Sequence, residues 1–136
     1  MSYNIIEIEG IGPAHEAKLN TAGIKTTEHL LHKGGTKKGR AALAEETGIA
    51  EKSILTWVNH ADLFRIKGIA GQFAELLEAA GVDTVKELSH RVPENLHAKL
   101  EETNNEKKLS GSIPSLAALT QMIADAKKLE PKVSHL

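Results

Sequence analysis

The chain contains no cysteine and very few aromatic residues. The absence of cysteine excludes disulfide-stabilised scaffolds and cysteine-rich zinc sites, and it is compatible with a reducing cytoplasm, where we expect the protein to reside. Aromatic residues make up 3% of the 136 residues, whereas apolar residues of all kinds make up 40%. The core must therefore consist mainly of leucine, isoleucine, valine and alanine, a composition that favours packed helices over sheets.

Long apolar runs and an excess of charge of one sign are also absent. The apolar stretches are far too short to span a bilayer, and the N-terminus lacks the charged segment and apolar core of a signal peptide, so we expect no membrane partner. There are 17 basic and 18 acidic residues, which gives a formal charge of −1. No global positive field attracts nucleic acid, and any phosphate binding must come from a local patch.

The sequence does contain a glycine-bounded segment that occurs twice, 58 positions apart. When residues 8–32 are laid over residues 66–90 without gaps, 9 of 25 positions are identical. The two copies keep their glycines and apolar spacers, while their charged residues differ. A repeat of this kind preserves a backbone shape, and the shape it predicts is a tight hairpin between two helices.

Capping and stop signals predict helices throughout, and no segment alternates as a strand would. Pro13 suits the first position of a helix that ends at Gly23, and Trp57 is expected to pack between the two copies. We read 104–112 as a loop and 130–136 as a frayed tail. Further helices are predicted over 28–32, 41–47, 51–64, 72–80, 85–91, 93–103 and 114–129.

The first copy resembles the helix-hairpin-helix motif of DNA repair enzymes, polymerases and recombinases. The residues that carry this resemblance are Gly10-Ile11-Gly12-Pro13 and, after a helical run, Ala22-Gly23-Ile24. The second copy departs from the motif because Ala70 replaces its second glycine. Over nearly its whole length the chain also resembles a bacterial family of domains of unknown function that is built from two such units.

This resemblance implies an all-α fold of tandem helix-hairpin-helix (SAM-like) units, with about four helices each, packed as one compact domain. The first unit, with a connecting helix, is expected over 1–64, the second over 65–129, and the tail over 130–136. Because a unit of under 70 residues is marginal alone, we expect the two to share a core.

The resemblance also implies that the amides of both hairpins bind phosphate. Glycines let the backbone turn tightly and let a ligand approach closely, and the first N–H groups of the next helix lack internal partners. Lysines and an arginine near the hairpins are placed to assist, and the basic segment after the second predicted helix is either another phosphate-contacting loop or a solvated one. The candidate nucleic-acid-binding residues are Gly10, Ile11, Gly12, Lys18, Lys37, Lys38, Arg40, Arg65, Lys67, Gly68, Ile69 and Ala70.

Catalytic and metal-binding patterns find little support. The chain has no Gly-x-Ser-x-Gly nucleophile elbow and no P-loop of the kind found in nucleoside triphosphatases. We therefore expect neither an enzyme nor a cofactor. His29 and His32 have a spacing that suits a metal, but no third ligand accompanies them and we expect no metal.

The sequence therefore favours weak, sequence-independent binding of nucleic acid, above all DNA, through the backbone of the hairpins. The alternative is a protein-interaction or scaffolding module, with an unidentified protein partner, that keeps the fold without binding nucleic acid. The neutral charge favours this alternative, as do Glu9 and Glu16, because carboxylates beside the first hairpin repel phosphate.

Overall fold

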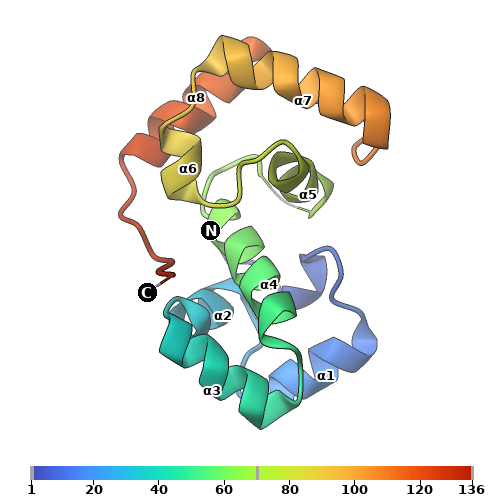
Figure 1. Ribbon diagram of the computed structural model, residues 1–136, viewed down its shortest axis with the longest axis vertical. Coiled ribbons are helices and arrows are strands. Elements are labelled where there is room, and N and C mark those ends of the chain that lie inside the picture. Colours follow the sequence, from blue (N-terminus) through green and yellow to red (C-terminus); the bar gives the residue numbers. More distant parts are fainter. Residues whose placement is uncertain (1, 70, 136) are drawn as a thin grey trace.

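The computed structural model describes residues 2–69 and 71–135, and this part of the chain is all-helical and compact (Figure 1). A short 3-10 turn, η1, precedes the helices, and no described helix is long and apolar enough to cross a membrane. The elements are η1 (Ile5–Glu7), α1 (Pro13–Thr21), α2 (Thr27–Gly34), α3 (Lys37–Thr47), α4 (Glu51–Leu63), α5 (Gly71–Ala79), α6 (Val85–Ser89), α7 (Pro93–Lys107) and α8 (Leu116–Lys127).

Side-chain caps explain where several helices begin. Thr26, Thr36, Thr84 and Ser115 each accept a hydrogen bond from the amide three residues later, at the start of α2, α3, α6 and α8. Two predicted boundaries were wrong for this reason. Thr36 starts α3 four residues earlier than expected, which places the basic segment inside the first turn of that helix, and Ser115 starts α8 after the proline rather than at it.

The two copies of the repeat have the same hairpin geometry. In the first copy, the amides of Ile8 and Ile11 donate to the carbonyls three residues earlier, at 3.0 and 3.1 Å. The amides 58 positions later make the corresponding hydrogen bonds, both at 3.1 Å. Gly10 and Gly68 have φ angles of +93° and +94°, a left-handed conformation that glycine adopts at no steric cost. The retained glycines therefore encode a retained turn.

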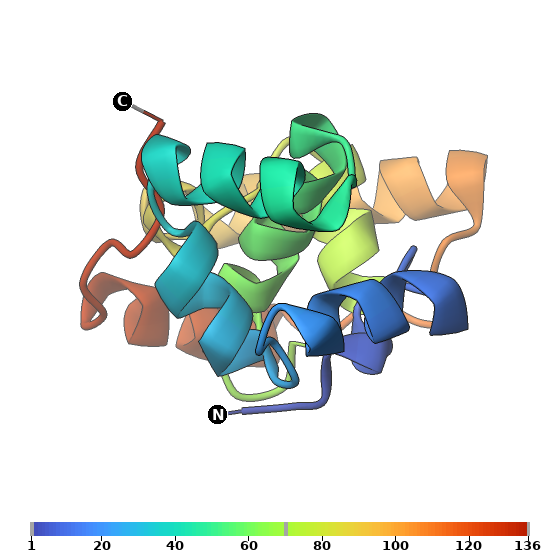
Figure 2. The same ribbon diagram turned by 90° about the horizontal axis from the view of Figure 1, so that it is seen from below.

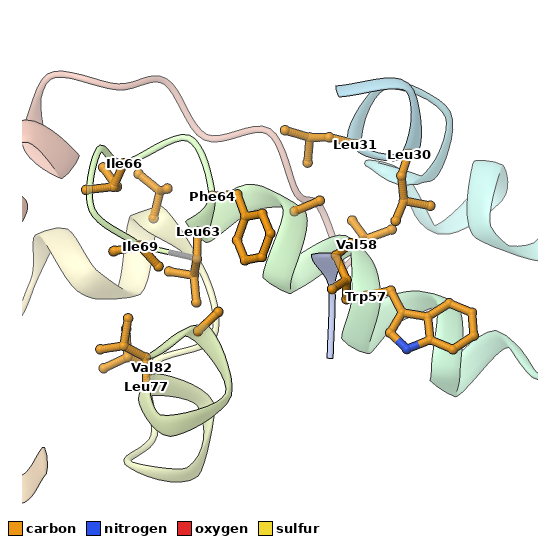
Figure 3. Packing of buried hydrophobic residues seen from close by; sticks show 14 of the residues in the cluster. Leu30, Leu31, Trp57, Val58, Leu63, Phe64, Ile66, Ile69, Leu77 and Val82 are labelled. Atoms are coloured by element: carbon orange, nitrogen blue, oxygen red, sulfur yellow. The ribbon is translucent and has the colours of Figure 1, made fainter. Parts of the chain in front are cut away.

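A single hydrophobic cluster spans both copies, and α4 runs through it (Figure 3). Leu30 and Leu31 of α2 pack around one end of α4, whereas Leu77 and Val82 of the second copy lie at its other end. Phe64, directly after α4, is fully buried between the two groups. The expected shared core is present, because the connecting helix supplies apolar side chains to both copies.

Trp57 occupies a different place from the one expected. The indole Nε1 atom lies 3.3 Å from the position that a Cβ atom would take at Gly10, and the ring lies 5.0 Å from the imidazole of His15. Trp57 therefore packs against the first hairpin and the start of α1. The aromatic contact near the middle of the core is instead an edge-on pair between Phe64 and Tyr3, with ring centroids 5.4 Å apart.

The C-terminal segment, predicted to be a frayed tail, lies against the first copy and ends near α2 (Figure 1). Ser134 donates its amide to the carbonyl of Gly35 at 2.7 Å, and the Ser134 carbonyl accepts from Arg40 at 2.6 Å. Arg65 donates to the carbonyl of Glu130 at 2.9 Å. Two arginines thus hold the segment in place through its backbone.

Candidate functional site

The first hairpin leads into a helix whose N-terminus is open. Gly12 is the N-cap of α1, has an ordinary extended backbone, and makes no side-chain capping hydrogen bond. Apart from its chain neighbours, no residue among 2–69 and 71–135 has an atom within 4 Å of the position that a Cβ atom would take there. The first hydrogen bond of the helix runs from the amide of Glu16 to the carbonyl of Gly12 at 2.9 Å, so the amides of Ala14 and His15 precede it.

The Ile11 amide, one of the predicted phosphate donors, is already used. It donates to the carbonyl of Ile8 inside the turn, and the Ile69 amide does the same in the second hairpin. Both isoleucine side chains are buried, and they anchor the hairpins to the core. The donors that the first hairpin can present are therefore those around Gly10, Gly12 and the first turn of α1.

The second hairpin is more crowded than the first. A Cβ atom at Gly68 would meet the Cε atom of Met122 in α8 at 2.9 Å. A Cβ atom at Gly71, where α5 begins, would lie 3.8 Å from the Glu9 carboxylate and 3.9 Å from the carbonyl of Glu7. Ala70, the predicted third donor of this hairpin, lies outside the described residues.

These contacts place the two hairpins side by side, with an acidic side chain between them. The carboxylate of Glu9 lies at the N-terminus of α5, where the helix dipole favours negative charge. A phosphate at the same place would have to displace or repel that carboxylate. Of the two hairpins, only the first retains an open helix N-terminus within the described residues.

Of the basic residues near the hairpins, Lys18 on α1 and Lys67 in the second hairpin are exposed. Arg65 is largely engaged: its Nε atom donates to Asp62 at 2.8 Å, and Nη2 lies 2.7 Å from the same carboxylate. Together with its bond to the C-terminal segment, this gives Arg65 a structural role. The hairpins thus have two exposed lysines near them instead of three basic side chains.

The basic segment on α3 does not join the hairpins. Lys37 and Lys38 are exposed in the first turn of α3, and in Figures 1 and 2 that turn and the first hairpin lie on opposite sides of the molecule. Arg40 is 2% exposed and donates to the carbonyls of Gly34 and Gly35 at 2.9 and 3.1 Å. Burial lowers the pKa of Arg40, and nearby Glu51 opposes that shift.

Asp62 is a buried charged residue that sequence reasoning did not single out. Its carboxylate accepts from the amide of Val85 at 2.9 Å and pairs with Arg65. In the first copy the corresponding amide, that of Thr27, donates to the carbonyl of Tyr3 at 2.8 Å. A side chain therefore replaces a backbone acceptor at the start of α6. The only sequence signal was a carboxylate within the apolar C-terminal end of α4.

Burial raises the pKa of Asp62, and the Val85 amide and the Arg65 guanidinium partly oppose this shift. The folded protein therefore holds this proton more tightly than the unfolded chain does. The contribution of Asp62 to stability is largest below the ordinary carboxyl pKa and is lost as the pH rises through the raised folded value.

We therefore expect the stability difference between the native protein and Asp62→Asn to fall as the pH rises. Urea unfolding of both proteins in steps from about pH 3.5 to pH 7 measures this difference directly. A difference that grows with pH would mean that the pair with Arg65 outweighs burial. The Asp125→Asn variant, which changes a half-buried carboxylate on α8, is the matched control.

No group of three or more His, Asp or Glu side chains that could hold a metal ion occurs among residues 2–69 and 71–135. His29 accepts a hydrogen bond from the Lys25 amide through Nδ1, at 3.3 Å. This hydrogen bond, at the start of α2, uses the lone pair of one imidazole nitrogen.

A family model described as a domain of unknown function, DUF4332, matches residues 9–129. The chain belongs to the DUF4332 family. The DUF4332 match covers nearly all of the first hairpin and the whole of the second, and it ends just before the C-terminal segment that the two arginines hold. No curated protein and no solved structure matches the chain.

Proposed function

We propose that the protein binds nucleic acid weakly and without sequence preference, through the backbone of its first hairpin. The observation that carries this proposal is the open, uncapped N-terminus of α1 at Gly12, directly after a tight glycine turn. Amides in such a position attract a phosphate oxygen through their N–H groups and through the helix dipole. Contacts of this type hold the nucleic-acid backbone and read no bases.

The proposal includes the assignment of both repeats as helix-hairpin-helix units. It is supported by the equivalent hydrogen bonds and glycine conformations of the two turns. The units have different roles in this proposal, because Glu9 lies where the second hairpin would receive phosphate. Lys18 and Lys67 add charge-assisted contacts from either side, whereas Arg40 and Arg65 stabilise the fold.

A Gly12→Asp substitution separates the binding function from the fold. Because Gly12 has an extended backbone and free space around it, aspartate fits there and caps α1, so stability should rise by about 0.3 kcal/mol. The new carboxylate occupies the phosphate position, and we expect affinity for DNA to fall by at least about tenfold. Fluorescence anisotropy with labelled duplex and single-stranded DNA, at about 50 and 200 mM salt, measures this loss.

Gly111→Asp is the matched control. Beyond its chain neighbours, no described residue has an atom within 4 Å of the Cβ position at Gly111, which lies in a loop of the second unit. It introduces the same charge and should leave DNA affinity nearly unchanged. An equal loss in both variants would assign the effect to net charge. Absence of saturable binding by the native protein at the lower salt would reject the proposal.

A protein-interaction module is the second candidate, and one observation favours it. The exposed Glu9 carboxylate lies beside Gly71 in the second hairpin, together with the backbone carbonyl of Glu7, which makes the junction between the hairpins electronegative. An electronegative junction suits a basic protein segment better than a nucleic acid. A failure of DNA binding at low salt would leave this candidate as the function to pursue.

A further inference from the structure

A cavity of about 570 Å³ lies on the face of α2, and its lining includes none of the hairpin residues or lysines proposed to bind phosphate. We call it the α2 cavity. Its walls come from four separate parts of the chain: Gly23 after α1, α2 itself, the end of α4 with Arg65, and Lys132 of the C-terminal segment. The volume lies in the range of pockets that hold small organic molecules.

The lining of the α2 cavity is cationic in a protein whose formal charge is −1. Lys33, Arg65 and Lys132 face a single acidic side chain, Glu28. No carboxylate of the described residues forms an ion pair with Lys33 or Lys132. The imidazoles of His29 and His32 also line the cavity and add N–H donors.

Two of these cations are held in position rather than free to move. The Nζ atom of Lys33 donates to the carbonyl of Ala22 at 2.7 Å, which leaves two of its three N–H groups for a ligand. Arg65 is fixed by Asp62 and by Glu130, while its Nη1 atom makes no hydrogen bond to any described residue. The donors are therefore preorganised, which reduces the entropy lost on binding.

The second copy provides an internal comparison. A cavity of about 430 Å³ lies on α6, at positions related to the α2 cavity by the repeat. There Lys86 stands at the position of Glu28, and Glu87 stands at the position of His29. Asp83 adds a second carboxylate to this lining. The positive lining is thus specific to the α2 cavity and is not a general property of this fold.

Beside the charged groups, the α2 cavity has an apolar part formed by Leu31 and Ala61. We propose that the α2 cavity binds a small organic anion with an apolar body, of the class of aromatic carboxylates, sulfonates and phosphate monoesters. The anionic group contacts Lys33, Lys132 and the free nitrogen of Arg65, and the apolar body packs on Leu31. This proposal does not depend on nucleic-acid binding at the hairpins.

Anilinonaphthalene sulfonate is a suitable probe, because it combines an anionic group with an aromatic body and becomes fluorescent in apolar sites. We expect saturable binding of one molecule per chain, and clearly weaker binding of the neutral analogue phenylnaphthylamine. Lys132→Glu should weaken sulfonate binding by about tenfold, because it replaces an attraction by a repulsion at contact distance. Lys99→Glu, the same change on exposed α7, should leave binding unchanged.

Three results would overturn the proposal: no saturable binding, equal binding of the neutral analogue, or equal weakening by Lys132→Glu and Lys99→Glu. The comparison of charged and neutral probes uses the native protein, so it stays decisive if a variant unfolds. Adding DNA to the loaded protein tests independence from the hairpins, because a DNA complex that retains the probe requires two separate sites.

Discussion

Arg40→Met is expected to lower the free energy of unfolding by about 3 kcal/mol, because it removes three hydrogen bonds to carbonyl groups, two of which are buried. The guanidinium of Arg40 donates to three carbonyl oxygens, those of Gly34, Gly35 and Ser134. Methionine fills a similar volume and has no donor, so the loss arises from unsatisfied hydrogen bonds rather than from a cavity. Urea unfolding followed by circular dichroism measures the change.

The same substitution should release the C-terminal segment, because Arg40 is one of the two arginines that hold it. Cleavage of the native protein by trypsin after Lys132 should be slow and should become much faster in Arg40→Met. Lys38→Met, an exposed change two residues earlier, should alter stability by less than about 0.5 kcal/mol and leave cleavage unchanged. Equal stability of the two variants would show that the carbonyls find other donors.

Gly39→Ala is expected to destabilise the protein by about 3 kcal/mol, a large effect for one methyl group. A Cβ atom at Gly39 would overlap the carbonyl oxygen of Lys33, at the end of α2. The clash is with backbone, so it cannot be relieved by rotating a side chain, and the turn between α2 and α3 must open. Thermal unfolding should show a midpoint lower by about 10 °C.

Gly111→Ala is the control for this effect, since a Cβ atom there would meet no atom of a described residue within 4 Å, its chain neighbours aside. In a loop whose backbone alanine can adopt, this change should be neutral or slightly stabilising. A small effect of Gly39→Ala would mean that α2 and α3 can separate without loss of packing. That outcome would also weaken the structural role assigned to Arg40, which bridges the same turn.

The glycines of the basic segment show how far sequence reasoning reached. Interleaved with lysines, they were interpreted as a phosphate-contacting or solvated loop. In the structure, a Cβ atom at Gly34 would lie 2.6 Å from a methyl group of Val58, and one at Gly35 would lie 2.5 Å from the carbonyl oxygen of Lys132. These two glycines therefore allow close packing. The sequence shows that a residue is small, whereas the neighbour that requires it to be small comes from elsewhere in the chain.

The hairpins were predictable because their determinants are local. A left-handed glycine, a proline at the first helical position and a threonine cap each act within a few residues, and the repeat presents most of these signals twice. The helical fold and the equivalence of the two turns follow from such signals. The end of α7 was predicted too early, because Lys108 adopts the left-handed conformation at φ +52° without a glycine to mark it.

The amino-acid sequence by itself therefore determined the helices, the two glycine turns and the family to which the chain belongs. The tertiary structure decided which charged side chains remain available to bind a ligand and which are engaged within the protein. Arg40 and Arg65 bind carbonyls 94 and 65 positions away, Glu9 lies against the second hairpin, and Lys132 joins the α2 cavity. Backbone conformation depends on near neighbours, whereas the partner of a long charged side chain depends on how distant segments pack, and that information is not local.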